Sequence, residues 1–138
     1  MSRRLGYRGY VSSRPFGGYC IPVPIQSLVL RDYCQRNGLV YVLPVNENIF
    51  PHSYLILEGM IRDLSAYQGI AMCSIHMLPH RAERRRQIFD TVLSQGSDLR
   101  FCTEEIIVSD EAGVARLEEL FALLDLAQTA PTRIPLNS

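Results

Sequence analysis

Apolar and polar residues alternate along the chain in short blocks that predict strands and helices in turn. Continuous apolar runs bounded by turn residues favour strands at residues 7–12, 39–43, 70–74, 99–102 and 106–108. Apolar residues at roughly helical spacing favour helices at about residues 21–36, 52–64, 80–95 and 111–126. The first helix carries Ile25, Leu28, Val29 and Cys34 at this spacing, and Asp110 is a suitable N-cap for the last one. The run at 39–43 suits a strand covered on both faces.

This order, β-α-β-α-β-α-β-β-α, predicts an α/β fold. Strands that alternate with helices imply a parallel sheet with helices on both faces. Right-handed crossovers then give a three-layer sandwich of flavodoxin-like topology, with a mainly parallel sheet of four to five strands. We expect a single domain over residues 1–127 and a loose C-terminal tail over residues 128–138, which contains two prolines.

Composition narrows the function classes. The 138 residues include 14 Lys+Arg and 14 Asp+Glu, so no net charge attracts nucleic acid or an acidic membrane. We expect a cytoplasmic protein with no nucleic-acid or membrane partner, because the chain has no long apolar run and no segment of signal-peptide type. All basic residues are arginine, which excludes a Schiff-base or P-loop lysine. The four cysteines are widely spaced, so we expect no zinc, redox or other cofactor site.

The loop after the first strand is the strongest candidate for a ligand site. Ligands of open α/β sheets bind at the carboxyl ends of the strands. Ser12, Ser13 and Arg14 leave such an end, and Gly17 and Gly18 allow close backbone approach. Hydroxyls, a guanidinium and free amides suit a phosphate or carboxylate, so we expect a small anionic ligand. The alternative is a tight loop that needs glycine for backbone reasons alone.

A second candidate is the basic start of the third helix, where His80, Arg81 and Arg84 precede its apolar stripe. Cations at a helix N-terminus oppose the macrodipole, so an anionic partner is expected nearby. That partner is a ligand, another subunit, or local acids such as Glu83. Helical spacing predicts that Arg81, Arg84 and Arg85 share one face. The alternative is a solvated basic face. The stripe that we expect to be buried comprises Ile88, Phe89, Val92 and Leu93.

A catalytic pair is predicted at His76 and Glu104, which follow the third and fourth strands. Histidine acts as a general acid or base near neutral pH, and a carboxylate completes such a set. The alternative for Glu104 is an exposed loop carboxylate. His76 and His80 have the i, i+4 spacing of a helical metal pair, but Pro79 interrupts a helix between them and no third ligand is obvious. We therefore expect no metal site.

Residues 9–13, 26–33 and 69–79 resemble the catalytic domain of serine recombinases, the resolvases and invertases. In that family a serine after the first strand attacks DNA phosphodiesters, and a D-R-L-x-R motif after a later strand supports it. The matching segment here is residues 76–80, His-Met-Leu-Pro-His, which lacks the aspartate and both arginines. The resemblance therefore implies a resolvase-like fold without strand exchange.

Three longer strings, at residues 8–19, 21–34 and 77–86, resemble the "sporadic carbohydrate cluster" family. Its members are small bacterial proteins encoded among genes for surface polysaccharides and sugar biosynthesis. The resemblance implies a pathway and does not imply a reaction.

Three functions follow from these observations. The first is binding of a phosphorylated or nucleotide-linked sugar, with His76 and Glu104 moving protons. The second is a non-catalytic partner protein of a carbohydrate gene cluster, which uses the arginine face and the last helix as an interface. The third, a nucleic-acid protein of resolvase descent, is disfavoured by the zero net charge and the missing motif. We expect a homo-oligomer, because Leu123 and Leu126 widen the apolar stripe of the last helix, which comprises Val114, Leu117, Leu120, Phe121 and Leu124.

Overall fold

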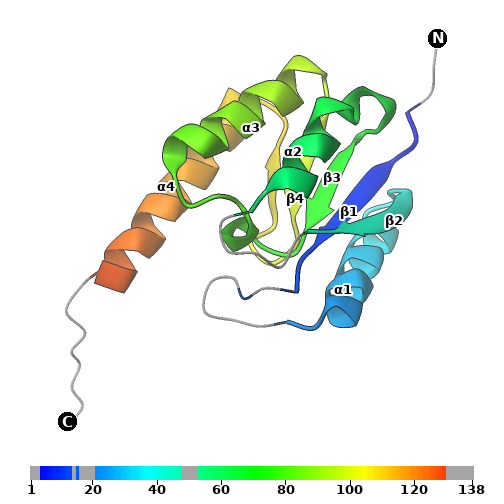
Figure 1. Ribbon diagram of the computed structural model, residues 1–138, viewed down its shortest axis with the longest axis horizontal. Helices are drawn as coiled ribbons and strands as arrows, with labels where there is room; N and C mark the ends of the chain where they lie inside the picture. The colour runs from blue at the N-terminus through cyan, green and yellow to red at the C-terminus, as the bar shows by residue number, and fades with distance from the viewer. Residues whose placement is uncertain (1–3, 14, 16–20, 48–52, 130–138) are drawn as a thin grey trace.

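A single five-stranded sheet forms the centre of the protein (Figure 1). The structure, a computed structural model, describes residues 4–13, 15, 21–47 and 53–129, with side chains as far as residue 124. The sheet order is β2-β1-β3-β4-β5, in which β5 is antiparallel to β4 and all other neighbours are parallel. The strands are β1 Tyr7–Val11, β2 Tyr41–Asn46, β3 Gly69–Met72, β4 Asp98–Phe101 and β5 Ile106–Val108. This arrangement confirms the predicted α/β fold with a mainly parallel sheet.

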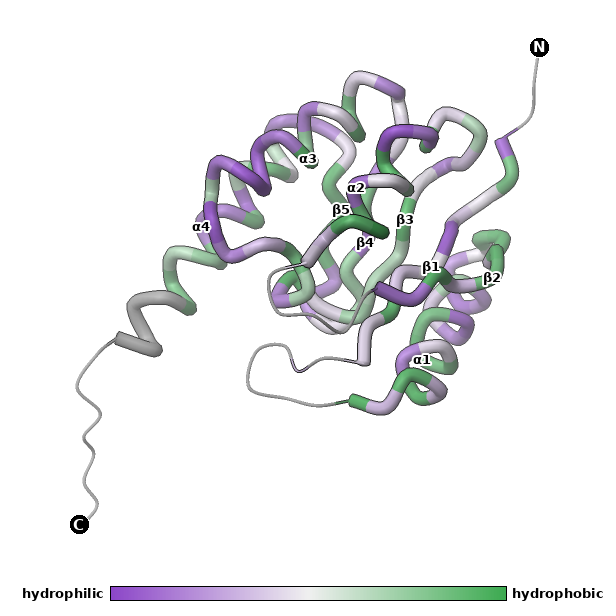
Figure 2. The backbone as a smooth tube through the Cα atoms, viewed as in Figure 1, coloured by the Kyte–Doolittle hydropathy of each residue, from purple (hydrophilic) through white to green (hydrophobic). Residues whose placement is uncertain are grey.

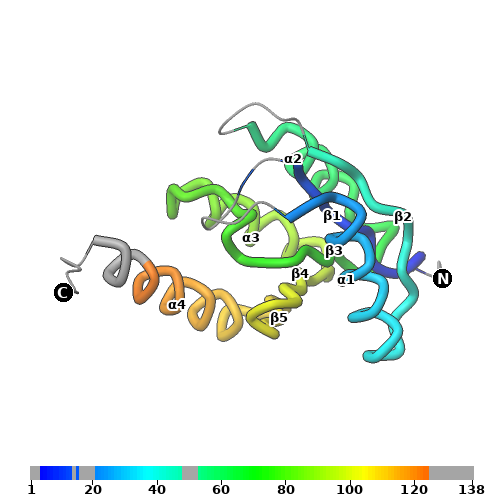
Figure 3. Tube along the Cα trace, turned by 90° about the horizontal axis from the view of Figure 1, so that it is seen from below, coloured from blue at the N-terminus to red at the C-terminus, as the bar shows by residue number. Residues whose placement is uncertain are grey.

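Helices cover the sheet on both sides. They are α1 Val23–Arg36, α2 Leu55–Arg62, α3 Ala82–Ser94 and α4 Glu111–Thr129, with two 3-10 turns, η1 Leu64–Ala66 and η2 Ile75–Met77. Helix α1 packs on one face of the sheet, α2 and α3 on the other, and α4 lies against β5 beside α3 (Figures 1 and 3). Residues 128 and 129 belong to α4, whereas the rest of the predicted tail lies outside the described residues. Within the described residues, no helix is both long and apolar enough to span a membrane.

The main hydrophobic core lies between the sheet and helices α2, α3 and α4. The strands contribute Tyr10, Met72 and Phe101, all fully buried, and a smaller cluster of Tyr7, Tyr33 and Cys34 packs under α1. Figure 2 shows hydrophobic residues along β3 and β5 and a largely hydrophilic α3. The core therefore fixes the strands whose carboxyl ends carry the predicted ligand residues.

Helix α1 forms as predicted, and Cys34 of its predicted apolar stripe is buried, but the rest of that stripe is not. Ile25, Leu28 and Val29 are 47%, 58% and 37% exposed. The buried residues of α1 are instead Gln26, Leu30, Tyr33 and Cys34. The helix is rotated so that the side-chain amide of Gln26 faces the sheet. The hydrogen bonds of this amide explain the rotation.

Strand β2 corrects the expectation of a strand covered on both faces. It begins at Tyr41 and extends through Pro44, and it lies at the edge of the sheet. Leu43 is 75% exposed. Proline is tolerated in an edge strand, because the missing N–H is not needed by a second neighbour. An apolar run alone does not distinguish an edge strand from a central one.

Candidate functional site

The carboxyl ends of three parallel strands bring hydroxyl-bearing residues into one row. Strands β1, β3 and β4 are paired in register, and the N–H of Thr103 donates to the carbonyl of Cys73, so the ladder continues past the strand ends. Ser12, Ser74 and Thr103 each lie two residues beyond the last paired residues of these strands, Tyr10, Met72 and Phe101. Neighbouring strands lie about 4.8 Å apart, so these three strand ends lie side by side along one edge of the sheet. The row therefore lies at the edge where ligand sites of such sheets form.

Gln26 closes both ends of the first loop. Its Nε2 donates to the carbonyls of Ser12 and Ile21, at 2.6 and 2.7 Å, and its Oε1 accepts from the N–H of Ser12 at 3.1 Å. The side chain is fully buried. Our sequence analysis missed Gln26, although a lone amide in an apolar helical run was a usable signal. The amide explains the rotation of α1, because its three hydrogen bonds require it to face the end of β1.

The predicted residues of the first loop are only partly within the described structure. Ser12 is 2% exposed and Ser13 is exposed. Arg14, Gly17 and Gly18 lie outside the described residues. The anion-binding role of this loop therefore stays a prediction.

Glu104 organises the turn that carries His76. Its Oε2 accepts from the hydroxyl of Ser74 at 2.7 Å, and its Oε1 accepts from the N–H of Ile75 at 3.0 Å. The Ser74 hydroxyl oxygen in turn accepts from the N–H of His76 at 3.2 Å. The predicted pair is thus brought to one turn, and the link between its members runs through Ser74. A carboxylate held in this way positions the turn.

The imidazole of His76 lies at the border of the strand-end row and α4. The residue is half-buried, and its ring meets Phe121 edge-on, with ring centroids 6.2 Å apart. The guanidinium of Arg85 lies 3.9 Å from the centroid of the same Phe121 ring. His76 is therefore supported by α4 and keeps part of its surface in contact with solvent.

The expectation that Arg81, Arg84 and Arg85 share one face is wrong for Arg85, whereas Arg81 and Arg84 line one surface pocket. Arg85 is 5% exposed, and its guanidinium donates to both carboxylate oxygens of Glu118 at 2.8 and 2.6 Å. It also donates to the carbonyls of Pro79 and His80. Helix α4 packs against the side of α3 that carries Arg85. Arg85 therefore links the η2–α3 loop, α3 and α4.

The remaining arginines of this segment have acidic neighbours within the chain. Arg84 forms an ion pair with Glu58 of α2 at 3.1 Å, and exposed Arg81 lies 3.8 Å from Glu83. Of the three expected kinds of partner for these arginines, the structure shows local acids. His80 is exposed beside Arg81. The ion pair directs the guanidinium of Arg84 toward α2, while its side chain still lines one pocket with Arg81.

Glu47 is a buried acid that the sequence pattern did not predict. It is 4% exposed and accepts from the hydroxyl of Tyr10 at 2.9 Å and from the N–H groups of Ile56 and Leu57, each at 3.1 Å. The carboxylate thus caps the first turn of α2. The sequence shows no capping motif for this contact, because Glu47 lies eight residues before the first residue of α2. Its role is to join the end of β2 to β1 and α2.

The described cysteines are protected thiols. Burial raises the pKa of Cys73 to about 11 and that of Cys102 to about 12. Both thiols stay protonated at neutral pH, which makes them poor nucleophiles. Among the described residues, no group of three His, Cys, Asp or Glu side chains is arranged to hold a metal ion.

Comparisons with known proteins identify the fold. No family model matches the chain, and no curated protein matches its sequence. The N-terminal catalytic domain of TP901-1 integrase matches with a TM-score of 0.60 and 16% identity, over 91% of this chain and 99% of that chain. A resolvase family site-specific recombinase from Streptococcus pneumoniae matches with a TM-score of 0.62 and 12% identity, over 88% of this chain and 89% of that chain. The protein therefore has the fold of resolvase and serine-integrase catalytic domains.

Proposed function

We propose that the protein binds a small anionic sugar derivative, phosphorylated or nucleotide-linked, at the carboxyl edge of its sheet. The observation that carries this proposal is the row of Ser12, Ser74 and Thr103, with His76 and Glu104 at the same edge. The proposed context is bacterial biosynthesis of a surface polysaccharide or unusual sugar. That context comes from the sequence resemblance to the "sporadic carbohydrate cluster" family.

Each residue has a distinct role in this proposal. Exposed Ser13 and Thr103 offer hydroxyls to the ligand, and Arg14 supplies positive charge. His80 and Arg81, exposed beyond η2, supply further donors at this edge, whereas Arg84 is directed toward Glu58.

His76 is the proton carrier of the proposed site. Its backbone N–H is held by Ser74, and Ser74 is held by Glu104. Glu104 therefore positions the turn, since both of its oxygens accept hydrogen bonds from it. Proton transfer by a positioned histidine suits isomerisation, epimerisation or dehydration of a sugar.

A thermal-shift screen tests the proposal. The ligands are sugar phosphates, nucleotide sugars and inorganic phosphate, and the proteins are wild type, Arg14→Ala and the control Arg36→Ala. Arg36 is exposed in the last turn of α1 and paired with Asp32. A ligand at 100 times its dissociation constant stabilises the protein by about 2.7 kcal/mol. We expect a shift in wild type and in the control that is lost in Arg14→Ala; no shift with any ligand contradicts the proposal.

A non-catalytic partner protein is the second candidate, and exposed apolar side chains favour it. Leu28 on α1, Leu43 on β2 and Leu123 on α4 are 58%, 75% and 58% exposed. Under this alternative the chain is a homo-oligomer or part of a hetero-complex. Sedimentation velocity of wild type and Leu123→Asp tests it. The alternative predicts an oligomer that Leu123→Asp dissociates, and a wild-type monomer without a co-purifying partner opposes it.

A further inference from the structure

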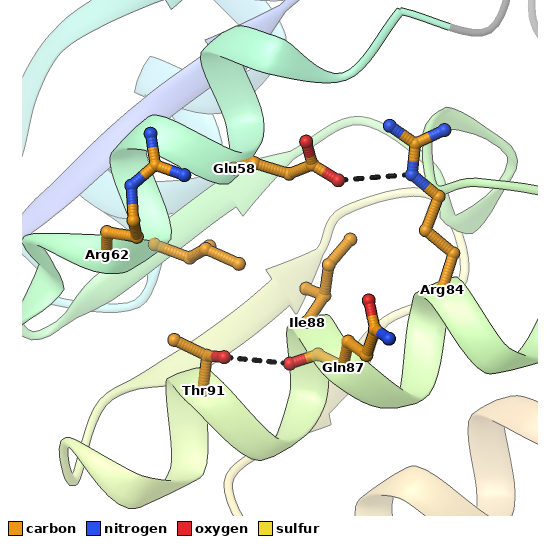
Figure 4. Close-up of a pocket in the computed structure, with 7 residues that line it drawn as sticks. Glu58, Arg62, Arg84, Gln87, Ile88 and Thr91 are labelled. Carbon is orange, nitrogen blue, oxygen red and sulfur yellow. Dashed lines mark hydrogen bonds and ion pairs between the residues drawn. The ribbon is translucent and has the colours of Figure 1, made fainter.

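A pocket lies in the helical layer, between α2 and α3 and outside the strand-end row. It has a volume of about 170 Å³. Figure 4 shows Arg62 at one end and Arg84 at the other, with Glu58 between them and Gln87 on the opposing helix. We call this space the α2–α3 slot. Its volume is below the roughly 300–1,000 Å³ of drug-sized sites, so a small ligand is the appropriate class.

The slot is held open by contacts at both ends. At one end Arg84 pairs with Glu58 at 3.1 Å and stacks over the ring of Tyr54 at 5.0 Å. At the other end the side-chain amide of Gln95 in the cap of α3 donates to the carbonyls of Ile61 and Thr91. These contacts set the separation of the two helices, so the slot exists before any ligand binds.

The floor of the slot is apolar, and two of its polar side chains have no protein partner. Ile61 and Ile88 form the floor and are 4% and 1% exposed. Within the described part of the chain, no hydrogen bond or ion pair engages the guanidinium of Arg62 or the carboxamide of Gln87. The hydroxyl of Thr91 is already used, since it donates to the carbonyl of Gln87. Two sets of donors therefore face an apolar floor.

The charge of the slot favours a single negative charge on the ligand. The lining includes two guanidinium groups and one carboxylate, so its formal sum is one positive charge. A monoanion neutralises this charge, whereas a phosphate dianion leaves one negative charge uncompensated. Arginine binds the planar carboxylate group through two parallel hydrogen bonds. The apolar floor requires an apolar body beside that group.

We propose that the α2–α3 slot binds a small organic acid with one carboxylate and a short apolar body. Arg62 takes the carboxylate, and the apolar body extends over Ile61 and Ile88 toward Gln87 on the facing helix. This site is independent of the sugar-binding proposal, because it uses none of the strand-end residues.

An NMR titration of the full ¹⁵N-labelled chain tests this site. The probes are 3-methylbutanoate, its neutral amide, acetate and inorganic phosphate. We expect saturable changes at the amides of Arg62, Gln87 and Thr91 with 3-methylbutanoate, weaker ones with acetate, and none with the neutral amide. No saturable change with 3-methylbutanoate, or tighter binding of phosphate or the neutral amide, overturns the proposal.

A pair of variants separates the slot from general anion binding. Arg62→Met keeps an aliphatic stem at an exposed position and removes the charge, so we expect it to fold, as a melting curve will check. Loss of one charge-assisted contact weakens 3-methylbutanoate binding roughly tenfold to a hundredfold. Arg36→Met, on the opposite face of the sheet, leaves binding unchanged. Equal affinity in Arg62→Met and wild type contradicts the slot, and neither outcome bears on sugar binding through Arg14.

Discussion

Replacing Gln26 by methionine tests whether its buried amide sets the geometry of the first loop. Methionine keeps the approximate shape of glutamine but offers no donor to the two carbonyls and no strong acceptor to the N–H of Ser12. Three hydrogen bonds are lost at a side chain that is fully buried.

The expected cost follows from those three bonds. Each contributes about 1 kcal/mol net, so the free energy of unfolding falls by about 3 kcal/mol. For a domain of this size that change lowers the melting temperature by roughly 10 °C. The N–H of Ser12 also loses its acceptor, so its hydrogen exchange becomes faster than in wild type.

Urea unfolding followed by circular dichroism measures the cost, with Gln35→Met as the matched control. Gln35 lies on the same helix and is exposed, so its replacement changes stability by less than about 0.5 kcal/mol. Equal free energies of unfolding for Gln26→Met and Gln35→Met refute the reasoning. They would show that the hydrogen bonds of the Gln26 amide make no net contribution to stability.

Three further predictions concern buried groups. Arg85→Met breaks the fork to Glu118 and lowers the free energy of unfolding by about 3 kcal/mol, which a shift of the urea midpoint will show. Burial raises the pKa of Tyr7 from 10.0 to about 12, so the folded state retains a proton there that the unfolded chain releases. Stability therefore declines as pH rises from 10 to about 12, and Tyr7→Phe flattens this decline in urea titrations. Cys73 and Cys102 resist iodoacetamide in the folded protein at neutral pH and react after unfolding, as peptide mass spectrometry will record.

The sequence predicted those parts of the fold that depend on local periodicity and capping. The stripe of α3 is buried as expected at Ile88 and Phe89, and that of α4 at Leu117. Asp110 caps α4 by accepting from the N–H of Gly113 at 2.9 Å. Each of these features is determined by residues within one or two helical turns, which is why the pattern was sufficient.

Features set by contacts across the chain were not predictable in the same way. Helix α1 turns Gln26 inward because the partners of that amide are at the end of β1, outside the helix. Arg85 is buried because Glu118, 33 residues later, meets it. Periodicity describes which residues share a face, and it does not say which face another element will cover.

The sequence predicted where the candidate site lies better than it predicted the contacts that each residue makes. Strand topology correctly brought Ser12, His76 and Glu104 to one edge of the sheet. It did not reveal Ser74 as the link between the catalytic candidates, because that role depends on the 2.7 Å hydrogen bond to Glu104. Nor did it reveal that Arg84 is directed toward α2.

The most direct test of the central claim is an NMR titration with the sugar phosphate or nucleotide sugar that shifts the melting temperature most. A ¹⁵N-labelled chain reports each backbone amide separately. The account predicts that the largest saturable changes occur at Ser13, Ser74, His76 and Thr103, at the carboxyl ends of β1, β3 and β4. Changes confined to other parts of the chain, or no saturable change at these four amides, contradict it.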